Sequence, residues 1–121
     1  SDMSPHRAAG LILWGIRYNL NREPARRIEF VRERMAATPR PVIDDVVGLM
    51  MTMPDVRADL AALEVPTLIA VGERDLWPLA QYREFAERIR ADVRVYPVGH
   101  SPTETAPHQL TRDLVRHFGA V

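Results

Sequence analysis

The 121-residue chain contains no cysteine and no lysine, and its only serines are Ser1, Ser4 and Ser101. The lack of cysteine excludes disulfide bonds, thiolate nucleophiles and cysteine-ligated zinc, and it fits a reducing compartment, so we expect a cytoplasmic protein. Sixteen arginines balance sixteen acidic residues, and this neutral charge gives no reason to expect nucleic acid or an anionic membrane as a partner. No apolar run approaches the roughly 20 residues of a membrane span, and no signal peptide opens the sequence.

Two apolar runs end in residue types that take part in acid–base chemistry. Residues 65–75 read Val-Pro-Thr-Leu-Ile-Ala-Val-Gly-Glu-Arg-Asp, and residues 98–100 read Val-Gly-His. If both runs are parallel strands, Asp75 and His100 meet at the carboxyl edge of one sheet. A carboxylate there orients an imidazole, and the imidazole takes a proton from a hydroxyl nucleophile. We therefore predict that Asp75 and His100 are catalytic.

Each candidate residue also has a plainer interpretation. Asp75 alone is better explained as an acceptor of backbone amides in a turn, and His100 as a loop histidine bonded to a main-chain carbonyl. The presence of both motifs favours the catalytic interpretation. Trp77 is predicted to line a substrate pocket, with packing under the acid loop as an equal alternative. His108 and His117 lie nine residues apart and no His-Glu-x-x-His motif occurs, so we expect no metal site and no cofactor.

The sequence contains no candidate for the nucleophile. No Gly-x-Ser-x-Gly segment or comparable turn with small neighbours is present. Ser101 directly follows His100, so its side chain is expected to point away from the imidazole. We predict that the chain alone has no esterase activity.

Several of these segments resemble the carboxyl-terminal half of an α/β-hydrolase. Residues 58–75 are similar to that family's penultimate strand and acid turn, residues 98–107 to its histidine loop, 110–118 to its closing helix, and 7–14 more weakly to the strand after the nucleophile elbow. The family's chain order is nucleophile, acid, histidine. The resemblance, which extends to esterases, enol-lactonases and cofactor-free haloperoxidases, implies a triad that acts on ester or lactone substrates once an amino-terminal half supplies the nucleophile. The alternative is a non-catalytic module used for assembly or binding.

The hydrophobic pattern predicts an α/β fold class, in particular a partial α/β-hydrolase fold with about three parallel strands, flanking helices and a short helical lid. The strands are expected near residues 10–16, 67–71 and 93–96, and the helices at 23–37, 42–51, 55–63, 79–90 and 107–118. We expect residues 1–121 to form a single carboxyl-terminal portion of a hydrolase domain, with lid-like helices at about 23–53 and the acid and histidine loops at 72–78 and 97–104.

The segment 10–16 also leads to an expectation about partners. As a strand, Leu11-Ile12-Leu13-Trp14-Gly15-Ile16 would expose an apolar edge without lysine, proline or charge, and such edges pair with other chains. We expect either an amino-terminal hydrolase half or a second copy of the chain to pair along this edge, with the former favoured because it restores the triad.

Overall fold

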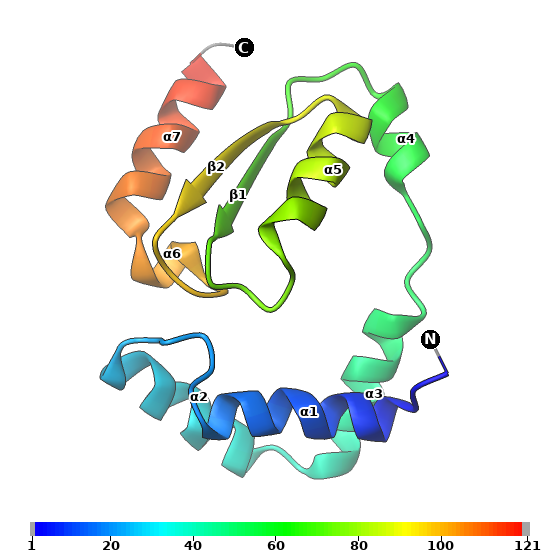
Figure 1. Ribbon diagram of the computed structural model, residues 1–121, viewed down its shortest axis with the longest axis vertical. Helices are drawn as coiled ribbons and strands as arrows, with labels where there is room; N and C mark the ends of the chain where they lie inside the picture. The colour runs from blue at the N-terminus through cyan, green and yellow to red at the C-terminus, as the bar shows by residue number, and fades with distance from the viewer. Residues whose placement is uncertain (1, 120–121) are drawn as a thin grey trace. The chain divides into compact units, whose positions relative to one another are not determined.

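The computed structural model describes residues 2–119 and divides after Pro54 into two compact units. We call residues 2–54 the helical unit and residues 55–119 the mixed unit. The helical unit consists of α1 (Pro5–Arg17), α2 (Ala25–Ala37) and α3 (Arg40–Met51). The mixed unit consists of α4 (Arg57–Ala62), β1 (Leu68–Gly72), α5 (Leu79–Ile89), β2 (Asp92–Tyr96), α6 (Pro102–Thr105) and α7 (Pro107–Gly119), which are labelled in Figure 1.

In the helical unit, α1 packs against α3 and α2, and Ala9 of α1, Ile28 of α2 and Val47 of α3 are buried. The α1 helix begins where Ser4 accepts a hydrogen bond from the Arg7 N–H at 3.2 Å, with Pro5 at the first helical position. A serine cap followed by proline is a strong helix start because it satisfies one terminal donor and removes another. Many large apolar side chains of this unit remain about half exposed or more, so its core is small.

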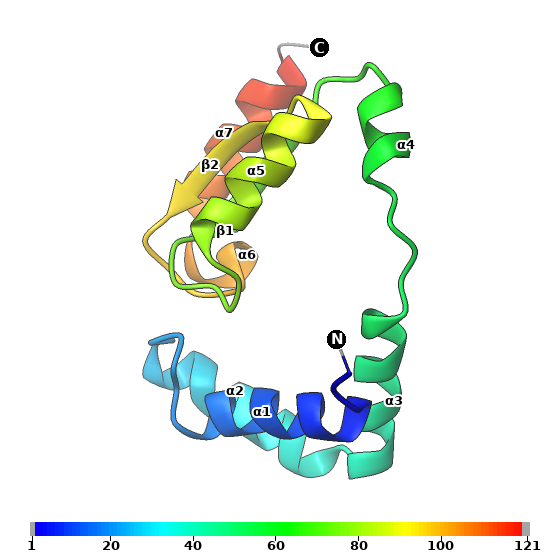
Figure 2. The ribbon, with the colours of Figure 1, turned by 45° about the vertical axis from the view of Figure 1, so that its right-hand side comes forward.

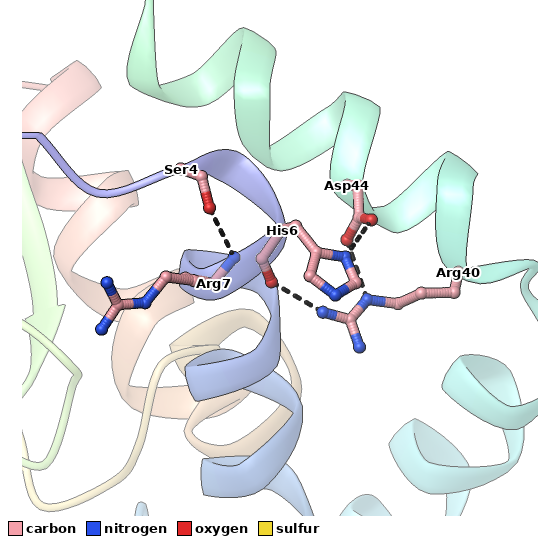
Figure 3. A network of polar contacts seen from close by, with 5 residues as sticks. All are labelled: Ser4, His6, Arg7, Arg40 and Asp44. Carbon is pink, nitrogen blue, oxygen red and sulfur yellow. Dashed lines mark hydrogen bonds and ion pairs between the residues drawn. The ribbon is translucent and has the colours of Figure 1, made fainter.

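A polar network fastens α1 to α3, as Figure 3 shows. His6 Nδ1 lies 2.6 Å from Asp44 Oδ2, and Arg40 donates through Nε to Asp44 Oδ1 at 2.8 Å. Arg40 also donates through Nη2 to the His6 carbonyl at 2.7 Å. The hydrogen bond from His6, followed by that from Arg40, lowers the pKa of Asp44 below its ordinary value.

The mixed unit is built on two parallel strands. Leu68 is paired with Asp92 and Gly72 with Tyr96, and α5 connects the two strands. Figure 2 shows α5 on one side of the strands, with α7 on the other. Tyr96 packs with Ala106 and Leu110, and partly buried Ala70, Val98 and Leu114 surround this cluster. The strand pair thus lies between helices. The acid loop follows the carboxyl end of β1, and the histidine loop follows the carboxyl end of β2.

The predicted α/β class with three parallel strands is wrong. Within residues 2–119 the chain is mostly helical, and its sheet contains β1 and β2 alone. The parallel pairing of the segments near 67–71 and 93–96 is present, but residues 10–16 lie inside α1. Leu11 and Trp14 are 58% and 54% exposed while Ala9 is fully buried, which is one-sided helix burial and not the two-sided burial expected of a central strand. The partial α/β-hydrolase fold is not what this chain forms.

This correction also removes the basis for pairing through 10–16. A helix satisfies its backbone donors and acceptors internally, so α1 offers no strand edge to a partner. None of the helices in residues 2–119 combines the length and apolar character needed to cross a membrane.

Candidate functional site

The loops that follow β1 and β2 are joined by main-chain hydrogen bonds. Glu73 N–H donates to the Tyr96 carbonyl at 2.8 Å, and Arg74 N–H donates to the Val98 carbonyl at 3.0 Å. The Arg74 side chain adds a bond from Nη1 to the Pro97 carbonyl at 2.9 Å. These bonds extend the strand pairing past the last residues of β1 and β2. As a result, the acid loop and the histidine loop are held side by side.

Gly72 lets the two loops approach this closely. A Cβ atom at this position would lie 1.8 Å from the Gly99 carbonyl oxygen and 2.6 Å from the Val98 carbonyl oxygen. Both distances are far below van der Waals contact, and the obstructing atoms belong to the backbone, so no side-chain rotation relieves the clash. The histidine loop can therefore lie this close to β1 only because residue 72 has no side chain.

Asp75 is the buried anchor of the site. Its side chain is only 5% exposed. Its amide N–H donates to the Gly72 carbonyl at 3.2 Å, which closes the turn after β1. Oδ1 accepts the Leu76 N–H at 2.6 Å, and Oδ2 accepts the Tyr82 hydroxyl at 2.7 Å. With a donor on each oxygen, the carboxylate is fixed in one orientation.

The structure brings Asp75 and His100 together. Nδ1 of His100 lies 2.8 Å from Asp75 Oδ1, within the hydrogen-bond range expected from the sequence. In the neutral ring, a proton on Nδ1 makes this bond and leaves the lone pair on Nε2. The His100 side chain is 58% exposed, in contrast to its buried partner. The arrangement thus joins an immobilised carboxylate to an imidazole that solvent can reach.

Tyr82 belongs to this site although the sequence analysis did not identify it. It lies in the first turns of α5 and reaches back to Asp75. Burial of the phenol, reinforced by its hydrogen bond to Asp75, raises the pKa of Tyr82 well above its ordinary value. Tyr82 therefore stays a neutral hydrogen-bond donor throughout the physiological range.

Trp77 lies beside the imidazole. The two ring centroids are 6.3 Å apart, with planes inclined by 46°, and Trp77 is 45% exposed. An indole that is half exposed next to an exposed imidazole can contact an apolar group of a bound molecule. The same contact also restricts the ring of His100, so the packing alternative is compatible with this position.

The described part of the chain has no cluster of three or more histidine, aspartate or glutamate side chains able to hold a metal ion. Ser101 begins the short α6 segment, and its carbonyl accepts the N–H groups of Glu104 and Thr105 at 3.0 and 3.1 Å.

No protein-family model matches this chain, and no curated protein matches it either. The resemblance to α/β-hydrolases thus stays a prediction based on the two loops.

Proposed function

We propose that the mixed unit supplies the acid and the histidine of a nucleophile–histidine–acid triad that hydrolyses ester or lactone-type substrates. The observation that carries this proposal is the 2.8 Å contact between Asp75 Oδ1 and His100 Nδ1, made by a carboxylate that is 5% exposed and an imidazole that is 58% exposed. In such a pair the acid orients the base and stabilises the imidazolium that forms during the reaction.

The proposed mechanism assigns one role to each group. Asp75 holds the His100 proton on Nδ1, so that Nε2 takes the proton of an attacking hydroxyl. The hydroxyl adds to the carbonyl carbon of the ester, and His100 then passes the proton to the leaving alcohol. In the second half of the reaction, His100 takes a proton from a water molecule, which attacks the acyl carbon. His100 then returns the proton to the nucleophile as the acid product leaves. Trp77 contacts the apolar part of the substrate beside His100.

The nucleophile comes from another polypeptide segment in this proposal. The chain has no Gly-x-Ser-x-Gly segment, and its serines are confined to positions 1, 4 and 101. The donors that stabilise the oxyanion are assigned to that other segment as well. The cysteine-free composition leads us to propose the cytoplasm as the location, which cell fractionation tests.

The test is a reconstitution with a candidate polypeptide that contains a Gly-x-Ser-x-Gly segment. Hydrolysis of a nitrophenyl ester is measured for each polypeptide alone and for the mixture, and a fluorophosphonate probe reports the reactivity of the nucleophile. We expect turnover and labelling in the mixture, and no turnover above background with this chain alone. Asp75→Asn and His100→Gln should each lower kcat/KM by about 10⁴-fold, as expected for triad members.

Matched control variants lie outside the site. Asp92→Asn changes an exposed acid on β2 and His108→Gln an exposed histidine on α7, so both should retain the activity of the unaltered mixture. Full activity in Asp75→Asn and His100→Gln would overturn the proposal. Turnover by this chain alone that disappears in Ser101→Ala would overturn the assignment of the nucleophile to another segment.

A further inference from the structure

The outer edge of β1 carries backbone groups that have no strand beside them. The Thr67 carbonyl accepts the Asp92 N–H, and the Glu73 N–H donates to Tyr96, so alternate residues from 67 to 73 face β2. The N–H and C=O groups of Leu68 and Ala70 consequently point to the opposite side. In residues 2–119 no third strand lies there, and no turn or loop donates a backbone hydrogen bond to these two residues.

The two edges of this sheet differ in their side chains. β2 carries the exposed charged residues Asp92 and Arg94, which disfavour pairing with another chain. β1 reads Leu-Ile-Ala-Val-Gly, without charge, lysine or proline, and it contacts the helices α5 and α6. A continuous apolar run of this kind is typical of a central strand of a parallel sheet. β1 therefore has the sequence of an interior strand, although it lies at an edge of the sheet and carries no charged side chain that would disfavour pairing.

Exposed apolar side chains lie in the chain segments immediately before and after β1. Leu63 and Val65 precede the strand and are 58% and 56% exposed, and Leu76 follows it at 50% exposed. An open hollow of about 350 Å³ lies at the start of the strand, where its lining includes Leu60, Val65 and Ile89. The strand thus has a hollow near its start and an exposed apolar side chain in the loop that follows its end.

We propose that the outer edge of β1 pairs with the same edge of a second copy of this chain. The two β1 strands run antiparallel about a two-fold axis and form a four-stranded sheet with β2 at each outer side. A two-fold arrangement is complete with two copies. Each contact between residue i of one copy and residue j of the other occurs a second time with the copies interchanged, so no paired edge is left for a third copy.

The features of the edge favour a second copy as the occupant. Antiparallel pairing brings the loop after β1 of one copy, with Leu76, to the end where the other copy has its hollow. By symmetry this contact between Leu76 and the hollow forms twice in the dimer, once at each end of the paired strands. Because the strand is uncharged, no like charges oppose each other along it.

Sedimentation velocity of the full chain between 1 and 100 µM tests the proposal. We expect a species of about twice the 13.8 kDa chain mass at the upper end of this range. Ala70→Pro removes an outward N–H while the bonds between β1 and β2 come from its neighbours, so this variant should sediment as a monomer. Val93→Pro makes the equivalent change on the outer edge of β2 and should remain a dimer.

Amide exchange on the unaltered chain gives a readout that does not depend on a variant folding. The Leu68 and Ala70 amides should exchange at least about tenfold more slowly at 100 µM than at 1 µM, while Val93 and Val95 exchange equally at both. A monomer over the whole range would overturn the proposal. A dimer in which Leu68 and Ala70 stay unprotected, or a dimer that persists in a folded Ala70→Pro variant, would also overturn it.

Discussion

The Tyr82 hydroxyl donates to Asp75 Oδ2 at 2.7 Å, on the oxygen that is not shared with His100. The acid of the proposed triad is therefore held from both sides: α5 provides Tyr82, and the acid loop provides the Leu76 N–H on Oδ1. Because the side chain of Asp75 is almost completely shielded from solvent, water cannot readily replace a lost donor. Tyr82 thus keeps the carboxylate oriented toward the imidazole.

Replacing Tyr82 by phenylalanine should lower the free energy of unfolding of the mixed unit by about 1–3 kcal/mol, the usual cost of leaving a buried polar atom without its partner. Urea denaturation followed by Trp77 fluorescence measures this change, in a Trp14→Phe background so that only the mixed unit reports. Tyr18→Phe removes an exposed hydroxyl in the helical unit and should change the value by less than about 0.5 kcal/mol. Equal stability of Tyr82→Phe and its parent would show that the hydrogen bond does not anchor Asp75.

Gly72→Ala should separate the two loops. The added Cβ would lie 1.8 Å from the Gly99 carbonyl oxygen, so the backbone of the two loops must move apart, and we expect the contact between Asp75 and His100 to lengthen. We expect a loss of about 3 kcal/mol in the stability of the mixed unit, at the upper end of overpacking effects. Nitrogen NMR of His100 should show that the proton no longer stays predominantly on Nδ1.

Gly119→Ala is the matched control, because a Cβ at that position meets no atom within 4 Å. It should leave both the stability and the His100 spectrum essentially unchanged. An unaltered His100 spectrum in Gly72→Ala would mean that Gly72 does not set the position of the histidine loop.

The meeting of Asp75 and His100 could be predicted from the sequence because it depends on a simple rule. Two apolar runs that become parallel strands must place their following loops at the same edge. Tyr82 could not be predicted in this way, since a tyrosine in an amphipathic helix is most often a packing residue. Nothing in one sequence distinguishes a phenol that packs from a phenol that reaches back to an acid.

The segment 10–16 shows where pattern alone fails. A continuous apolar run fits a buried strand and an apolar helix equally well, and periodicity does not separate them. The deciding signal lies upstream, in Ser4 and Pro5, which form the cap and first position of α1. The wrong strand gave the wrong fold class, and it placed the uncharged strand edge at 10–16, whereas in the two-stranded sheet of residues 2–119 the uncharged edge is that of β1.

The helical unit should lose stability in acid. The pKa of Asp44 is lowered by its hydrogen bonds with His6 and Arg40, so the stabilisation is complete above the ordinary value of 3.8 and is lost as the pH falls below it. Thermal unfolding followed by Trp14 fluorescence in a Trp77→Phe background measures this loss between pH 5 and pH 2. Asp44→Asn should reduce the pH dependence and lower Tm at pH 5. Asp45→Asn alters the neighbouring exposed acid and should retain the dependence, and a slope unchanged by Asp44→Asn would contradict the prediction.

The mixed unit should lose stability in alkali through Tyr96. Its hydroxyl donates to Asp113 Oδ2 at 2.6 Å, and burial together with this bond raises the pKa of Tyr96 to about 12. Since the ordinary value is 10.0, the stabilisation is complete below about pH 10 and is lost as the pH rises toward 12.

Urea denaturation at pH 8, 10, 11 and 12, followed by Trp77 fluorescence in the Trp14→Phe background, should show this decline. Tyr96→Phe should be less stable by about 1 kcal/mol at pH 8 and should decline less steeply, because only Tyr82 then remains as a phenol with a raised pKa in this unit. Tyr18→Phe should keep the parental slope. A Tyr96→Phe variant that declines as steeply as its parent would show that ionisation of this phenol does not limit stability in alkali.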